Sequence, residues 1–261
     1  MKLTLVGQER LIAENDQEVF LALKNHVYEQ GEYFLLELSE DELYVWVQMD
    51  DALEPSLIYV PEGEWRYDVV LDESLRRAYS PKIFTGARHY IRAWLPTEQE
   101  IYCYRNLARN AHDQKEFQKA YPHVSANVET RDDSTFFARN AIDGMLSNDD
   151  HGSFPYQSWG INQQPDAVLT LDFGRFVTID KIALVFRADY PHDSYWTNVT
   201  IEFDSTDSIQ LTTTNSTNRQ FFNIPSRTVK LLVLKELVKH KDESPFPALT
   251  ELEVYGTNIK K

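Results

Sequence analysis

The sequence has little of what would cross-link a chain, anchor it in a membrane or draw it to nucleic acid. Its single cysteine, Cys103, excludes a disulfide within the chain. It has no run of apolar residues long enough to cross a bilayer. It contains 26 Lys and Arg against 41 Asp and Glu, and the resulting net charge of −15 would repel a phosphate backbone. We therefore expect no membrane span and no nucleic acid partner.

The amino-terminal residues lack the apolar stretch of a secretory signal. Glu9 and Arg10 interrupt the short apolar start before such a stretch can form. We therefore expect a cytoplasmic location, or an extracellular one if a leader has been removed.

Aromatic residues make up 13% of the chain, and they fall in short runs that alternate with polar residues. This pattern is typical of strands with one buried face. In the first half, turn residues such as those at 29–31 and 61–63 separate the runs. The predicted strands are 19–24, 33–38, 42–49, 56–60, 64–70 and 89–95. A succession of strands without intervening helices predicts a first β-sandwich.

One helix is predicted between the two halves. Thr97 is a good N-cap, and Glu100 three residues later completes a capping box. The helical periodicity continues through Leu107 and Ala108. The chain then turns polar, so we predict an N-terminal domain over residues 1–115 and a second domain over 116–261. The segment 105–113 is expected to join them through polar contacts.

The second half again predicts strands with few helical signals. Val199 and Ile201, for example, alternate with polar neighbours. The predicted strands are 167–173, 178–187, 197–203, 208–213, 219–224, 228–236 and 249–255. Seven short strands in succession indicate a second β-sandwich, and the fold class is therefore all-β.

Four landmarks follow one another in this half. They are Ala-Arg-Asn-Ala-Ile-Asp-Gly at 138–144, Trp159, Pro-Asp-Ala-Val-Leu-Thr-Leu-Asp-Phe-Gly at 165–174 and Glu-Leu-Glu-Val-Tyr-Gly at 251–256. Together they resemble the discoidin domain, also called the coagulation-factor C-type domain, and its bacterial relatives among carbohydrate-binding modules. The resemblance covers about half of the chain. It implies a galactose-binding-like jelly roll that binds saccharide through loops gathered at one end.

The resemblance also implies a structural Ca²⁺. It assigns Asp143 and Glu251 as carboxylate ligands, with Asn140 and Thr250 as carbonyl donors. Such oxygens suit a hard cation. The link after Gly144 is longer than in the resembled family, which leaves the remaining ligands open. The alternative is that Asp143 caps a turn and Glu251 lies on a solvated strand face.

Three predicted loops of this half combine aromatic and charged residues. A sugar ring has an apolar face and a rim of hydroxyls, so it suits an aromatic platform beside polar groups. We predict Trp196 as an exposed stacking residue and Trp159 as largely core. The alternative is a buried Trp196 and an Arg187 that only ties down its loop. The predicted ligand-binding residues are His151, Tyr156, Trp159, Arg187, Asp189, His192, Asp193, Trp196 and Phe246.

No catalytic motif appears. The sequence has neither the GxSxG elbow of a hydrolase nor the HxH, HExxH or CxxC spacing of a transition-metal site. The sequence therefore favours a non-catalytic, bacterial carbohydrate-binding protein. Two alternatives stay open: a protein-interaction module that uses the same loops, and a glycoside hydrolase with an active site at the domain seam. The sugar and the oligomeric state are also left open.

Overall fold

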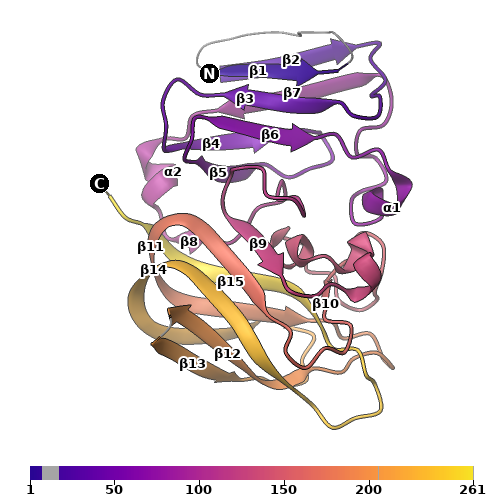
Figure 1. Ribbon diagram of the computed structural model, residues 1–261, viewed down its shortest axis with the longest axis vertical. Helices are drawn as coiled ribbons and strands as arrows, with labels where there is room; N and C mark the ends of the chain where they lie inside the picture. The colour runs from indigo at the N-terminus through magenta and orange to yellow at the C-terminus, as the bar shows by residue number, and fades with distance from the viewer. Residues whose placement is uncertain (8–17, 205, 261) are drawn as a thin grey trace.

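The structure is a computed structural model that describes residues 1–7, 18–204 and 206–260. Two β-rich units follow one another along the long axis of the molecule (Figure 1). The chain crosses between them more than once, because residues 105–106 pair with residues 255–256 of the second unit and Tyr121 then pairs with Tyr59 of the first. Within the described ranges, no helix has the length and apolar character needed to cross a bilayer.

The N-terminal unit is a sandwich of two antiparallel sheets. The first has the order β1-β3-β6, and the second has the order β2-β7-β4-β5. Buried and exposed residues alternate along β2, as predicted for a strand with one face on the core. The strands are β1 (Lys2–Val6), β2 (Glu18–Lys24), β3 (Tyr33–Glu37), β4 (Leu43–Gln48), β5 (Ser56–Val60), β6 (Glu64–Asp68) and β7 (Arg88–Trp94). The expected first sandwich is confirmed, with β1 as an additional strand that was not predicted from the sequence.

Two short helices belong to this unit, α1 (Glu73–Arg76) and α2 (Glu98–Tyr102). The predicted capping box at the start of α2 is present between Thr97 and Glu100. The predicted continuation of this helix is wrong, because the chain leaves it after Tyr102 and forms β8 (Arg105–Asn106) against β15. The backbone groups after Tyr102 form their hydrogen bonds with the edge of β15 instead of within a helix. The Leu107 N–H, for example, donates to the Val254 carbonyl at 2.7 Å.

The C-terminal unit is built on one curved antiparallel sheet with the order β10-β15-β11-β14-β12-β13, to which β8 and β9 add at β15 and β11. Its strands are β9 (His123–Ala126), β10 (Trp159–Gly160), β11 (Leu169–Phe186), β12 (Trp196–Asp204), β13 (Asp207–Thr212), β14 (Gln220–Lys239) and β15 (Ala248–Asn258). The prediction of an all-β fold is confirmed for this half of the chain. Its core includes Trp159, Phe173, Phe186 and Trp196.

Two predicted pairs of strands turn out to be single long strands. The segments 167–173 and 178–187 form β11, and 219–224 and 228–236 form β14. The register between them shifts after Asp172 and again after Ile179. Such bulges bend a strand without ending its pairing. The first part of β11 therefore pairs with β9, and the second part pairs with β15.

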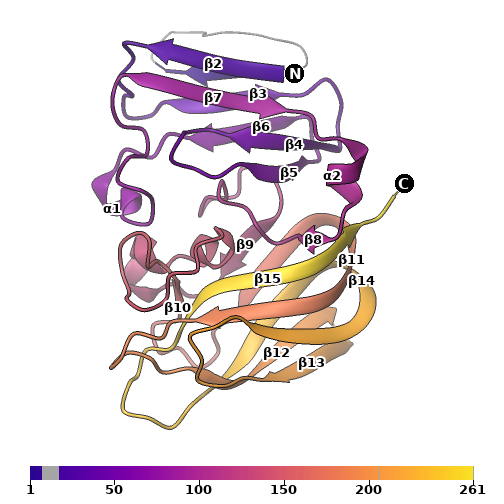
Figure 2. The ribbon, with the colours of Figure 1, turned by 180° about the vertical axis from the view of Figure 1, so that it is seen from behind.

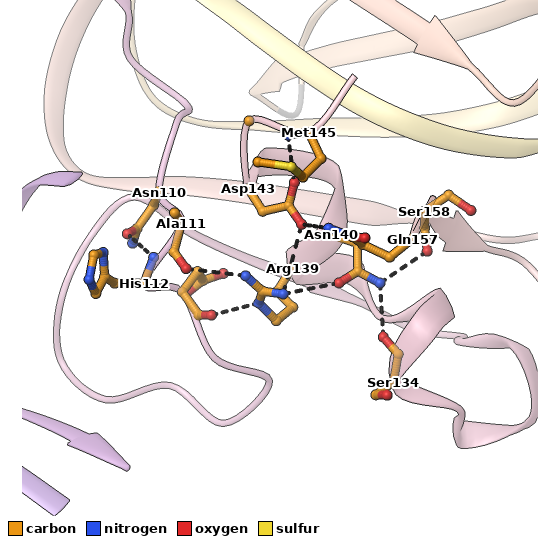
Figure 3. A network of polar contacts seen from close by, with 12 residues as sticks. Asn110, Ala111, His112, Ser134, Arg139, Asn140, Asp143, Met145, Gln157 and Ser158 are labelled. Carbon is orange, nitrogen blue, oxygen red and sulfur yellow. Dashed lines mark hydrogen bonds and ion pairs between the residues drawn. The ribbon is translucent and has the colours of Figure 1, made fainter. Parts of the chain in front are cut away.

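The seam between the units is polar, as expected for segment 105–113. The His112 ring accepts the Met49 N–H at 3.0 Å and lies 3.0 Å from the Ser56 hydroxyl, so it is anchored in the N-terminal unit. Arg139 donates to the carbonyls of Ala111 and Asp113 from the other side (Figure 3). The predicted domain boundary after residue 115 stays a prediction.

Three short 3-10 helices connect β9 to β10 beside this seam. They are η1 (Thr130–Asp132), η2 (Ser134–Phe136) and η3 (Ala138–Ile142). Arg139 and Asn140 on η3 are both buried and hydrogen-bonded. These turns carry one predicted metal ligand, Asn140, lead directly into a second, Asp143, and form one wall of the candidate ligand pocket.

Candidate functional site

A pocket of 160 Å³ lies among η1, the segment after β10, the β11–β12 loop and the β14–β15 loop. It brings together four of the predicted ligand-binding residues, which are His151, Arg187, His192 and Phe246. Phe246 is 42% exposed, so an apolar ring is available to a ligand. The pocket therefore combines an aromatic ring with polar side chains, as predicted for these loops.

Asp189 holds the charged residues of the loops in place. Its carboxylate is buried and lies 3.0 Å from the Arg187 guanidinium. The other carboxylate oxygen contacts His151 and lies 3.6 Å from His192. Arg187 also donates to the Phe246 carbonyl, and this bond ties the β11–β12 loop to the β14–β15 loop. Burial lowers the pKa of Arg187, and the Asp189 carboxylate opposes this effect.

The alternative prediction, in which Arg187 forms an ion pair that ties down its loop, is therefore correct, and the partner is Asp189. Their charges satisfy each other, and they orient the two histidines. The His151 and His192 rings meet edge to face with centroids 4.9 Å apart, and both remain partly exposed. Of the predicted residues, those that remain available to a ligand are thus the two imidazoles and Phe246.

The prediction of Trp196 as an exposed stacking residue is wrong. Its exposed fraction is 0%, and its ring packs edge to face against Phe186 with a centroid distance of 5.4 Å. Trp196 begins β12, and burial of its large apolar surface in the core outweighs exposure at the loop end. Trp159 is core as predicted, and its indole N–H donates to the Val128 carbonyl at 2.9 Å.

Two further predicted residues, Tyr156 and Asp193, are partly exposed but do not line the pocket. The pocket also contains polar residues that were not predicted from the sequence, which are Thr130, Arg131, Asn162 and Gln163. Asn162 and Gln163 adopt left-handed backbone conformations, with φ of 49° and 60°. Two polar amides in a turn are the only sequence signal that these positions offered.

Three of the loop residues have the chemistry of a transition-metal site. The ligand atoms of His151, Asp189 and His192 all lie within 4.8 Å of one another. Imidazole nitrogen with one carboxylate oxygen suits ions such as Zn²⁺. The sequence showed no metal-ligand spacing because the three residues come from two separate loops.

The predicted Ca²⁺ ligands form a buried carboxylate pair beneath the seam. Asp143 accepts the Met145 N–H at 2.8 Å and the Gln157 amide at 2.7 Å, and the Arg139 guanidinium is 3.9 Å away (Figure 3). Glu251 accepts the Gly144 N–H at 3.2 Å through one oxygen. The alternative of a solvated Glu251 is wrong, because this residue is 1% exposed.

The second carboxylate oxygen of Glu251 is buried and has no hydrogen-bond partner within the described part of the chain. Burial, and then the neighbouring Asp143 carboxylate, raise the pKa of Glu251 well above its usual range. Burial also raises the pKa of Asp143. A buried oxygen without a partner beside a second carboxylate fits a cation. The Asn140 side chain is used by protein contacts, since its amide donates to the carbonyls of Ser134 and Ser158.

No family model and no curated protein matches the chain. Solved structures do. Chitosan-binding module 1 of a chitosanase/glucanase from Paenibacillus sp. IK-5, in a selenomethionine-labelled mutant form, is 20% identical and matches over 59% of this chain and 100% of that chain, with a TM-score of 0.42. A Streptococcus pneumoniae fucose binding module is 18% identical over 60% and 98%, with a TM-score of 0.41. The family 32 carbohydrate-binding module of C. perfringens NanJ, in complex with galactose, is 17% identical over 51% and 91%, with a TM-score of 0.39.

Proposed function

We propose that this protein binds a saccharide, without catalysis, in the pocket between the loops of its C-terminal unit. The observation that carries the proposal is the partly exposed Phe246 ring beside His151 and His192 in one pocket. A sugar ring would lay its apolar C–H face on Phe246. Its hydroxyls would exchange hydrogen bonds with the two imidazoles.

The size and rigidity of the pocket support a small ligand. Its volume of 160 Å³ is below that of pockets for drug-sized molecules, so it suits a single ring or the end of a chain. The ion pair between Arg187 and Asp189 fixes the loops that hold the imidazoles before any ligand arrives. One stacked ring in an open site gives weak binding, because the desolvation of the sugar hydroxyls offsets much of the favourable interaction.

Calorimetric titration of the full chain with a panel of neutral monosaccharides tests this proposal. We expect Phe246→Ala to weaken the binding of the preferred sugar about tenfold, since loss of an aromatic platform costs about 1.4 kcal/mol. Phe221→Ala is the matched control, because Phe221 is also exposed but lies outside the pocket, on β14. Silence of the wild-type protein with every sugar, or equal losses in the two variants, would contradict the proposal.

We further propose that the Asp143 and Glu251 carboxylates hold a structural Ca²⁺. The ion would supply positive charge to two buried carboxylates that repel each other. Asp143 lies at the end of η3 and Glu251 on β15, so an ion between them would join the turn segment to the sheet. This role is structural and separate from contact with the sugar.

A further inference from the structure

A second hollow, with a volume of 500 Å³, lies between the two units and shares no lining residue with the loop pocket. We call it the seam cleft. Tyr44 and Tyr59 enter it from β4 and β5, and Arg175 and Phe176 enter it from the bend of β11. Helix α2 and the carboxyl-terminal end of the chain lie at the same side of the molecule (Figure 2). They contribute Tyr102 and Lys260.

Arg175 is a buried cation at the wall of this cleft, with an exposed fraction of 9%. Its Nε–H is shared between the Tyr44 hydroxyl at 3.0 Å and the Asn258 side-chain oxygen at 2.9 Å. Its Nη1 donates to the Phe173 carbonyl at 2.6 Å. None of these hydrogen-bond partners is charged. The guanidinium also lies over the Tyr44 and Tyr59 rings, with its central carbon 5.0 Å and 5.2 Å from their centroids. Burial lowers the pKa of Arg175, and the tyrosines and the Asp172 carboxylate oppose this effect. A buried cation whose hydrogen-bond partners are all neutral is costly to the fold.

Arg105 adds a second cation beneath the first. Its Nη1 donates to the Asn106 carbonyl at 3.3 Å. Its Nε and Nη2 are buried and have no hydrogen-bond partner among residues 1–7, 18–204 and 206–260. Burial, and then the Arg175 cation, lower the pKa of Arg105 to about 10. The two arginines create a locally positive potential in a chain of net charge −15.

Two lysines complete the cleft at its surface. Lys230 is exposed and has no ion-pair partner in the described part of the molecule, and Lys260 forms an ion pair with Glu98 at 2.6 Å. Glu42 is the carboxylate among the lining residues. The lining also carries aromatic rings, which offer flat surfaces to a ring-shaped ligand. The cleft therefore combines excess positive charge with apolar platforms.

We propose that the seam cleft binds an acidic saccharide, a sugar ring that carries a carboxylate. Arg175 receives the carboxylate at Nη2, the one guanidinium nitrogen that forms none of the hydrogen bonds above. Lys230 and Lys260 flank it, Arg105 supplies positive potential from below, and the tyrosine rings contact the sugar face. A purely structural role for Arg175 would account for its bonds to Asn258 and Phe173 but not for its Nη2, which takes part in none of these bonds at the wall of the cleft. This site is separate from the loop pocket and does not depend on the function proposed for it.

The test is a titration of the full chain with D-glucuronate, with D-glucose as the matched neutral ring and inorganic phosphate and sulfate as bare anions. We expect glucuronate to bind and glucose to bind more weakly at this site. Added sodium chloride should lower the affinity for glucuronate, because it screens the charges. Lys230→Ala should lower the affinity for glucuronate about fivefold, the effect expected from the loss of one flanking charge. Lys24→Ala, an exposed lysine on β2, should leave its affinity unchanged. Arg175→Lys should weaken glucuronate binding further than Lys230→Ala, because an ammonium cannot keep the bonds to Asn258 and Phe173 and present an N–H group to the ligand at the same time.

The outcomes separate this proposal from that for the loop pocket. Phe246→Ala should leave glucuronate binding intact, and Lys230→Ala should leave neutral-sugar binding intact. Equal affinity for glucuronate and glucose, or equal behaviour of the Lys230 and Lys24 variants, overturns the proposal. Binding of phosphate or sulfate with silence from glucuronate overturns the assignment to an acidic saccharide. If Arg175→Lys fails to fold, the Lys230 and Lys24 pair decides.

Discussion

The indole of Trp196 lies against Phe186 and Trp159, with ring centroids 5.4 Å and 6.3 Å away. All three side chains are fully buried in the core of the C-terminal unit. The Trp196 indole nitrogen has no hydrogen-bond partner within the described residues. The residue thus contributes packing, and its polar group is a small cost to the fold.

Trp196→Ala should therefore lower the free energy of unfolding by about 3 to 5 kcal/mol, the usual cost of emptying a buried Trp site. Trp196→Phe should cost less, because a ring remains and the unpartnered N–H is removed. Urea unfolding of both variants measures this. A Trp196→Ala variant that keeps wild-type stability and loses only sugar binding would instead restore the role first predicted from the sequence.

The loop sequence could not tell which aromatic residue faces outward. In a strand, the alternation of side chains predicts burial, but the segment around Trp196 is a loop that leads into a strand and offers no period. Phe246, in a short proline-flanked segment, was predicted as a site residue and does line the pocket. Tyr190, at 88% exposure, is more exposed than any of the predicted aromatics and was not among the predicted site residues.

Among the secondary-structure elements, the bend of β11 is the place where Gly174 lies close against the Tyr121 ring. Gly174 has a φ of 68°, and a Cβ at this position would lie 2.2 Å from the Tyr121 ring. In the sequence, the polar Gly-Arg interruption predicts a turn between two strands. Hydrogen bonding to β14 continues on both sides of it, so the interruption is a bulge within one strand. Propensity alone does not separate a bulge from a turn, because both favour glycine.

Gly174→Ala should destabilise the protein by about 2 kcal/mol or more, since backbone strain and the clash with Tyr121 act together. Gly31→Ala is the matched control. Its φ of 91° imposes similar strain, but a Cβ there would meet nothing within 4 Å. Thermal unfolding of the two variants isolates the clash. Equal melting temperatures would contradict the close approach of Tyr121.

The carboxylate pair joins two other elements, the end of η3 and β15. If a cation holds them together, Ca²⁺ should raise the melting temperature of the wild type, because a ligand that binds only the folded state stabilises it. Glu251→Gln should abolish this rise. In the presence of a chelator, the Glu251→Gln variant should be more stable than the wild type, since the buried carboxylate of Glu251 is gone.

Glu253→Gln serves as the control for this experiment. Glu253 lies two residues further along β15, and its carboxylate is paired with Arg219 at 3.1 Å. It should keep the full Ca²⁺ effect. A wild-type protein that melts at the same temperature in Ca²⁺ and in chelator would refute the cation site.

At the scale of the whole molecule, the seam is a buried polar layer. His112 reaches into the N-terminal core, where its ring meets Trp65 and Tyr67 at centroid distances of 6.3 Å and 5.5 Å. Arg139 contacts the same segment from the C-terminal unit. The sequence predicted that segment 105–113 would join two sandwiches. It could not predict the partners across the seam, since these depend on contacts between residues far apart in the chain.

This buried histidine makes stability depend on pH. Burial, and then the Arg139 cation, lower the pKa of His112 to about 3 from its ordinary value of 6.5. Between these values the unfolded chain binds a proton that the folded chain excludes. The stabilisation is therefore complete above pH 6.5 and is lost as the pH falls toward 3, by about 1.4 kcal/mol per pH unit.

His112→Gln removes this proton uptake and can keep an acceptor for the Met49 N–H. We expect it to be less stable than the wild type at neutral pH, because the ring packing is lost, but to lose less stability per pH unit below 6.5. Urea unfolding at a series of pH values measures the two slopes, and His240→Gln, on the exposed β14–β15 loop, is the control. Parallel slopes for the wild type and His112→Gln would show that the seam histidine titrates in the folded protein. The polar layer would then be open to water, and the two units would be less tightly joined than the contacts of His112 indicate.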